Sequence, residues 1–132
     1  MPQTRRALAL LTLLLLTGLT GCSAVVTDAE APGTYKAQAD WGVSTLILSR
    51  DHTFDQTVRL NTGKTKHLTG GWKLQRSSGD PVYTTINFNP YLNVTHTQQG
   101  AFSLAATFSI YHVPFGGINI AADPEYGIAH RK

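Results

Sequence analysis

The chain has 132 residues, a formal net charge of +3 and one cysteine, Cys22. Two of its cations, Arg5 and Arg6, precede an apolar N-terminal stretch, and the rest of the chain carries nine Lys or Arg against eight Asp or Glu. This balance gives no basic face for nucleic acid, and a single cysteine excludes internal disulfides and Cys-x-x-Cys metal or redox sites.

The first 21 residues have the pattern of a secretory signal. After Arg5 and Arg6, residues 7–19 form an apolar stretch of thirteen residues. A permanent membrane span needs roughly 20 apolar residues, so this stretch is too short and predicts a signal-peptide helix over residues 1–21.

Leu19-Thr20-Gly21-Cys22 follows this stretch and resembles the bacterial lipoprotein signal. The resemblance implies cleavage between Gly21 and Cys22, a diacylglycerol thioether on Cys22 and an acyl chain on the new N-terminus. Two or more chains make membrane attachment stable, so the membrane is the first expected partner. The alternative is ordinary secretion with cleavage after Ala24.

The residue after the cysteine bears on location. Ser23 stands where an Asp would resemble an inner-membrane retention signal. In a bacterium with two membranes, we therefore expect a lipid-anchored protein of the cell envelope, at the outer membrane and facing the periplasm.

The mature chain predicts one domain. Residues 22–32 are small and acidic without periodicity, which indicates a flexible tether, and residues 33–132 form the expected folded domain. Thirteen threonines in residues 22–132, and no apolar repeat of helical period after Pro32, predict an all-β fold.

Alternating apolar residues and turn residues predict short strands along the domain. Gly70-Gly71 suggests a bulge, and residues 91–102 an excursion with one short edge strand. Seven or eight strands predict an antiparallel meander closed into a barrel, with a β-sandwich as the alternative. The expected strands cover 43–49, 53–60, 66–70, 71–75, 82–88, 108–113, 117–122 and 128–131.

Three motifs carry a resemblance to small lipocalin-like barrels among bacterial envelope lipoproteins of uncharacterised function. They are Gly33-Thr34-Tyr35, Leu46-x-Leu48-x-x-Asp51-x-Thr53-Phe54 and Gly71-Trp72-x-Leu74. The C-terminal Phe115-Gly116-Gly117-Ile118-x-Ile120 resembles the ending of such lipoproteins. Copper-responsive relatives of this kind carry a Cys-x-x-Cys pair, which this chain lacks.

Catalytic and metal-binding motifs are missing from the sequence. There is no Gly-x-Ser-x-Gly, no His-Glu-x-x-His and no phosphate-binding glycine loop, so we predict no catalytic residue, metal or cofactor. No two histidines have the short spacing that presents ligands from one element. The five histidines are His52, His67, His96, His112 and His130.

Two acidic segments are the best local candidates for chemistry. His52 lies beside Asp51 and near Asp55, which could serve a metal or acid–base role; a polar hairpin tip is the alternative. Asp123 and Glu125 flank a proline, and we expect this turn to be exposed to solvent.

Aromatic residues carry the remaining functional signal. Six of the twelve fall at strand ends, in loops or opposite the predicted core face: Trp41, Tyr83, Tyr91, Tyr111, Phe115 and Tyr126. If they cluster, they would form an apolar groove or interface.

Three functions follow from these observations. The first is a non-enzymatic module that binds an envelope protein from its lipid anchor. The second is a carrier of a small apolar ligand with an internal cavity, which short strands disfavour. The third is an enzyme without a recognisable motif.

Overall fold

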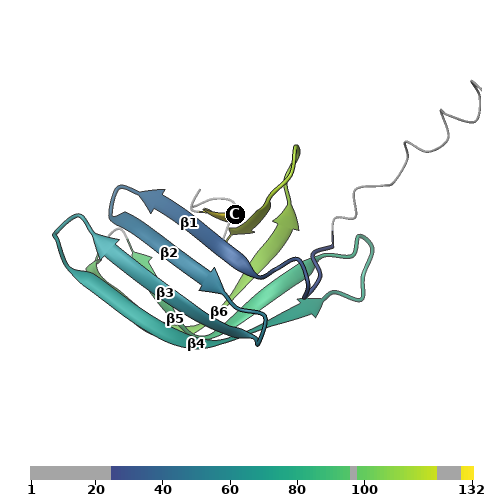
Figure 1. Cartoon of the computed structure of the whole chain (residues 1–132), viewed down its shortest axis with the longest axis horizontal. Helices are drawn as coiled ribbons and strands as arrows, with labels where there is room; N and C mark the ends of the chain where they lie inside the picture. The colour runs from purple at the N-terminus through teal and green to yellow at the C-terminus, as the bar shows by residue number, and fades with distance from the viewer. Residues whose placement is uncertain (1–24, 96–97, 122–128) are drawn as a thin grey trace, which may run out of the picture.

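The structure, a computed structural model, describes residues 25–95, 98–121 and 129–132. Its described part forms an antiparallel meander in which each strand pairs with the next and β8 pairs with β1 to close a barrel (Figure 1). The strands are β1 (Gly33–Ala39), β2 (Gly42–Leu48), β3 (Thr53–Leu60), β4 (Thr65–Arg76), β5 (Thr84–Thr95), β6 (Gln98–His112), β7 (Ile118–Ala121) and β8 (Ala129–Arg131).

This architecture confirms the expected all-β meander and its closure into a barrel; the sandwich alternative does not form. Within the described ranges, no helix has the length and apolar character of a membrane span. Several predictions concern residues outside these ranges: the signal-peptide helix over 1–21, the Gly21–Cys22 cleavage and lipidation position, His96, Asp123, Glu125 and Tyr126.

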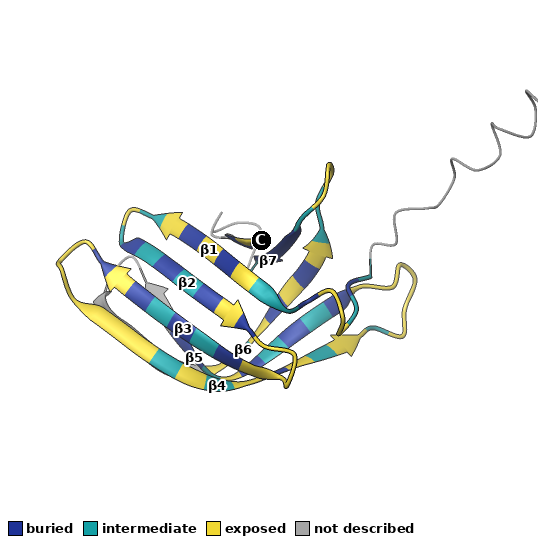
Figure 2. Cartoon of the chain, in the orientation of Figure 1, coloured by how far each residue is buried: buried dark blue, intermediate teal, exposed yellow. Residues whose placement is uncertain are grey.

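Strands β2 and β3 show why the chain folds this way. Their side chains alternate between the barrel interior and solvent, with Leu46, Leu48, Phe54 and Val58 buried (Figure 2). Alternate side chains of a strand point to opposite faces, so the period-two pattern fixes which face becomes the core. The predicted extent of β3, residues 53–60, is confirmed.

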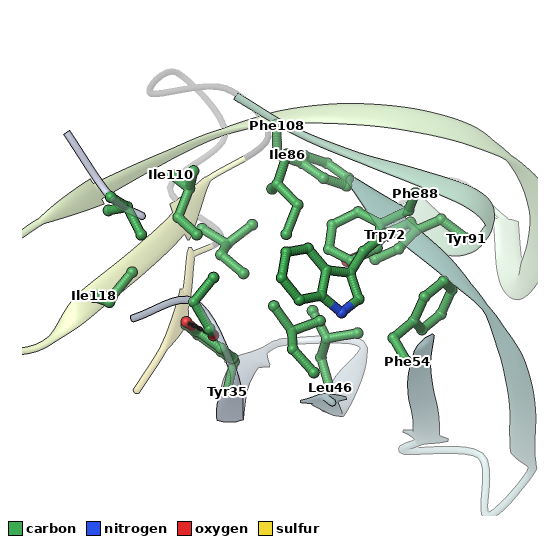
Figure 3. Close-up of a cluster of buried hydrophobic side chains, with 14 residues drawn as sticks. Tyr35, Leu46, Phe54, Trp72, Ile86, Phe88, Tyr91, Phe108, Ile110 and Ile118 are labelled. Carbon is green, nitrogen blue, oxygen red and sulfur yellow. Dashed lines mark hydrogen bonds between the residues drawn. The ribbon is translucent and has the colours of Figure 1, made fainter. Parts of the chain in front are cut away.

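The core is built around aromatic rings. Phe88, Tyr91 and Phe108 belong to the same buried cluster as Trp72 (Figure 3). Ring centroids are 5.1 Å apart for Phe88 and Tyr91, and 4.7 Å apart for Tyr91 and Phe108. These edge and tilted contacts are the arrangements that aromatic pairs prefer, so the rings fill this part of the interior with packed side chains.

Strand β4 is continuous, and the predicted Gly70-Gly71 bulge is wrong. The register with β3 runs unbroken through Phe54↔Gly70 and Thr53↔Gly71. Gly70 instead allows the backbone of β4 to lie close to Asn89 and Phe54. A Cβ at Gly70 would lie 2.7 Å from Asn89 O and 2.8 Å from Phe54 Cε1, so a side chain has no room there.

Strand β5 runs through Asn89-Pro90, where we expected it to end. Its register with β6 shifts between Phe88 and Tyr91, and pairing with β6 then resumes as far as Thr95. A bulge is one of the positions at which a strand tolerates proline. Strands β5 and β6 are therefore long, with 12 and 15 residues, and the expected excursion over 91–102 is wrong.

The described part of the expected tether, residues 25–32, is a turn packed on the barrel. Val26 and Ala31 are fully buried in the main core cluster. The Thr27 backbone N–H and Oγ1 both donate to Glu30 Oε2, at 2.9 Å and 2.7 Å. The prediction of a flexible segment is wrong for these residues. Thr27-x-x-Glu30 is a capping-box pattern that could have revealed the turn.

Candidate functional site

The turn between β2 and β3 holds the first candidate, Asp51 and His52. Asp51 Oδ1 accepts hydrogen bonds from the Thr53 N–H at 3.1 Å and Oγ1 at 2.6 Å, and these bonds lower the pKa of Asp51. The His52 ring stacks on Trp72 with centroids 4.4 Å apart. Both side chains therefore hold the turn in place.

Asp55 has a different partner from the one we considered. Its Oδ2 lies 2.8 Å from His67 Nε2 across the exposed face of β3 and β4. In the described ranges, no three His, Cys, Asp or Glu side chains come together as a metal site.

A buried polar cluster links three strands inside the barrel, and the sequence reasoning missed it. Ser44, Gln56 and His130 are each at most 6% exposed. His130 Nε2 lies 2.8 Å from Ser44 Oγ, and Gln56 Nε2 lies 3.4 Å from the same oxygen. The only sequence signal was polar residues at inward positions of apolar strands; the three positions lie too far apart along the chain to suggest a cluster.

Burial determines the chemistry of this cluster. It lowers the pKa of His130 to about 4, so the imidazole is neutral at physiological pH. A serine beside a neutral histidine is the geometry of an activated nucleophile. A substrate would nevertheless have to reach Ser44, which is only 2% exposed. The cluster therefore supports the core and is poorly placed for catalysis.

The second candidate is one end of the barrel, which we call the N-terminal rim. Because neighbouring strands are antiparallel, alternate turns gather at the end where β1 begins (Figure 1). The N-terminal rim comprises turn 25–32, turn 49–52, loop 77–83, turn 113–117 and Lys132.

Large exposed apolar side chains concentrate at this end. Across the described residues, five such side chains stand out, and each lies within the N-terminal rim or within two residues of it along the chain. They are Ile47, Val82, Tyr83, Tyr111 and Phe115. We call these five the apolar rim residues.

The strand register brings two of them together. Thr84 pairs with Ile110, and both point into the barrel. Extending this ladder by one residue places Tyr83 opposite Tyr111, both on the outer face.

Phe115 is the most exposed of the set. It occupies the tip of the hairpin between β6 and β7, which projects from the barrel with an exposed tip (Figure 2). The residue is fully exposed, and its φ of 68° lies in the left-handed region that bulky residues avoid. The ring makes no use of the barrel core.

Several contacts hold the N-terminal rim in one arrangement. Tyr35 Oη donates to Ala31 O at 2.5 Å, and His112 Nε2 lies 3.6 Å from Glu30 Oε1. Lys132 Nζ donates to Glu30 O at 2.9 Å and to Pro32 O at 2.7 Å. Turn 25–32 is thereby attached to β1, to His112 and to Lys132, so its position on the barrel is fixed.

The described turns at the opposite end have a different character. Residues 61–64 there read Asn-Thr-Gly-Lys and are exposed. Trp41, in the neighbouring turn, packs against a second core cluster of Val58, Leu60 and Leu92. In the part of the chain that the structure describes, the exposed apolar surface is therefore asymmetric.

Among the aromatic candidates, the structure brings Tyr83, Tyr111 and Phe115 to one end and removes Tyr91 from the set. Tyr91 is buried in the core, where burial raises the pKa of its phenol. The register shift beside Pro90 turns it inward, an effect that strict alternation could not predict.

A shallow groove of about 470 Å³ crosses the outer face of β4, β5 and β6. Lys73, Asn87 and Thr107 lie along it, and Thr107 Oγ1 donates to Asn87 Oδ1 at 2.5 Å. The groove thus offers a few polar groups within a mostly apolar lining on the side wall of the barrel.

These features define a closed antiparallel barrel with a packed aromatic core and an apolar rim at the end where β1 begins. No family model matches the chain, and neither a curated protein nor a solved structure matches it.

Proposed function

We propose that this is a lipid-anchored protein of the bacterial envelope, at the outer membrane and facing the periplasm, whose barrel is a non-enzymatic binding module. The lipoprotein-like Leu19-Thr20-Gly21-Cys22 supports the anchor. The carrying observation is that Val26, four residues after Cys22, is already fully buried in the core. A lipid on Cys22 would thus be joined almost directly to a folded domain.

The resemblance to lipocalin-like envelope lipoproteins gains support from the barrel. The closed meander is the architecture that this resemblance implies, and Tyr35, Phe54 and Trp72 of its motifs are buried in the core.

The packed interior favours a binding module over a carrier. Phe88, Tyr91 and Phe108 are buried and in mutual ring contact inside the barrel. A small closed barrel has an interior that side chains can fill, and here the inward side chains are large. In a carrier these rings would have to move apart to admit a ligand, so binding surfaces on the outside are the simpler arrangement.

The side wall is the surface we assign to a protein partner. With the N-terminal rim turned to the membrane, the groove of β4, β5 and β6 faces sideways and stays accessible. Its mostly apolar lining, with the amide of Asn87, the hydroxyl of Thr107 and the ammonium of Lys73 along it, suits a polypeptide surface of mixed polarity.

Substitution of the cysteine tests the anchor. Cys22→Ser and Cys22→Ala should abolish palmitate labelling and leave an unprocessed precursor or a soluble form, while Ser23→Ala should retain the label. Labelling and membrane fractionation unchanged by Cys22→Ser would refute the assignment. Partner binding is tested by cross-linking in cells from Asn87→Cys and Thr107→Cys; absence of any cross-linked protein at native expression would count against the module.

A further inference from the structure

We propose that the N-terminal rim seats in the interfacial layer of the bilayer, with Phe115 and Tyr83 inserted at headgroup level. This inference rests on the proposed lipid anchor and goes beyond it, because an anchor alone does not specify which part of a domain touches the membrane.

The reach of the chain is the first step of the argument. A fully extended chain covers at most 3.3–3.6 Å per residue, so the Cα atoms of Cys22 and Val26 lie at most about 14 Å apart. Val26 is fully buried, and turn 25–32 is held by the contacts of Tyr35 and Lys132. A bilayer that holds the Cys22 lipid must therefore lie close to the N-terminal rim.

The second step is the position of the apolar rim residues. Tyr83 is 59% exposed and Phe115 fully exposed, and they belong to two separate turns at the same end of the barrel. Val82 precedes Tyr83 in loop 77–83, and Tyr111 lies opposite Tyr83 when the β5–β6 register is extended by one residue. Aromatic side chains with an apolar body and a polar tip concentrate at membrane interfaces, and phenylalanine buries its ring in the same layer.

The third step is the backbone of Phe115. A bulky residue with positive φ is strained. The Phe115 ring is fully exposed, so packing against the barrel core does not offset this strain. Gly116 and Gly117 also have positive φ, at 91° and 108°, and complete a turn that places the ring at the tip. This geometry suits a Phe115 ring that becomes buried only when the barrel contacts a bilayer.

Charge identifies the kind of surface. The N-terminal rim carries Arg50 and Lys132, and the exposed Arg76 and Arg131 directly precede two of its segments; its anions are Asp28, Glu30, Asp51 and Asp80. Cations and anions thus nearly balance, so anionic headgroups gain no strong attraction. Insertion of apolar side chains is then the main contribution to binding of the N-terminal rim to the bilayer. This binding should change little with salt concentration.

Depth-dependent fluorescence tests the proposal on the full lipidated protein. Phe115→Trp and, as the matched control at the opposite end, Lys64→Trp are reconstituted into phosphatidylethanolamine–phosphatidylglycerol vesicles that contain brominated acyl chains. After subtraction of the shared signal of Trp41 and Trp72, we expect at least twofold stronger quenching for Phe115→Trp. The quenching should be equal in 0.1 M and 1 M NaCl, within about a fifth.

The outcomes separate this inference from the anchor. Intact mass first establishes whether the purified protein carries lipid. Lipidated protein with equal quenching at positions 115 and 64 would overturn the rim seating and leave the anchor standing. Protein without lipid would refute the anchor and this inference with it. Cross-linking of a photoreactive side chain at position 115 to a protein or to a second copy, without bromolipid quenching, would also overturn it.

Discussion

The side-chain amide of Gln56 in β3 forms hydrogen bonds with both backbone polar groups of Leu92 in β5. Gln56 Nε2 donates to Leu92 O at 3.0 Å, and the Leu92 N–H donates to Gln56 Oε1 at 2.9 Å. Strand β4 pairs with β5 only up to Gly71↔Asn89, so at Leu92 a side-chain amide takes the place of a neighbouring strand. The barrel interior is thereby closed where β4 and β5 separate.

Replacing Gln56 with Leu should therefore destabilise the fold. The substitution leaves the buried N–H and C=O of Leu92 unpaired, each at a cost of about 1–3 kcal/mol, so we expect a loss of about 2–6 kcal/mol in the free energy of unfolding. Urea denaturation followed by tryptophan fluorescence measures the change. Gln75→Leu, on the exposed face of β4, serves as control and should change stability by less than about 0.5 kcal/mol. Equal stability of the two variants would contradict the role of Gln56.

Gly70→Ala should be destabilising because its Cβ would lie 2.7 Å from Asn89 O and 2.8 Å from Phe54 Cε1. Backbone and ring must both shift, at a cost of about 1–3 kcal/mol. Gly79→Ala is the matched control, since no atom lies within 4 Å of a Cβ there. Comparison of the two thermal midpoints checks the prediction. A Gly70→Ala midpoint equal to that of Gly79→Ala would mean that β4 and β5 do not approach each other this closely.

His130 should make stability depend on pH. Its pKa falls from 6.5 to about 4 on folding, so between these values the unfolded chain binds a proton that the folded chain does not. Stability is then full above pH 6.5 and decreases as pH falls toward 4, by a total on the order of 3 kcal/mol. The lowered pKa values of Glu30 and Asp51 act at more acidic pH, as those carboxylates protonate.

The measurement for His130 is the urea midpoint from pH 7 to pH 4. His130→Gln keeps a polar side chain next to Ser44 without titrating, so it should flatten the profile. A slope that persists in His130→Gln would assign the pH dependence to another group.

Val26→Ala tests whether turn 25–32 belongs to the domain. Val26 is fully buried in the main core cluster, and removing two buried methyl groups should lower stability by about 1–3 kcal/mol. Val82→Ala removes the same atoms from an exposed side chain and is expected to change stability by less than about 0.5 kcal/mol. Wild-type stability in Val26→Ala would return residues 25–32 to the role of a loose tether.

The strands predicted best are those whose pattern is local. Residues 53–60 alternate clearly and end at a glycine-containing turn, so their bounds and inward face could be read directly. Strands β5 and β6 were misread because Asn89-Pro90 and Gln98-Gln99-Gly100 have the chemistry of breaks. Pairing along the whole length of β5 and β6 outweighs those local preferences.

The candidate site residues were likewise predictable from the sequence only where the signal is local. Tyr83 could be identified near the start of the predicted strand 82–88, on the face opposite the predicted core, and Phe115 from its place between two predicted strands. The antiparallel meander then puts both residues at one end. Ile47 was hidden in a continuous apolar run. The contact between Ser44 and His130 joins residues 86 positions apart, which no local pattern in one sequence can indicate.

The measurement that tests the central claim most directly is the mass of the N-terminal peptide of the protein extracted from membranes. We predict a peptide that begins at Cys22 and carries a diacylglycerol thioether together with an amide-linked acyl chain. An unmodified peptide that begins at Val25, or a peptide that still contains residues 1–21, would contradict the account.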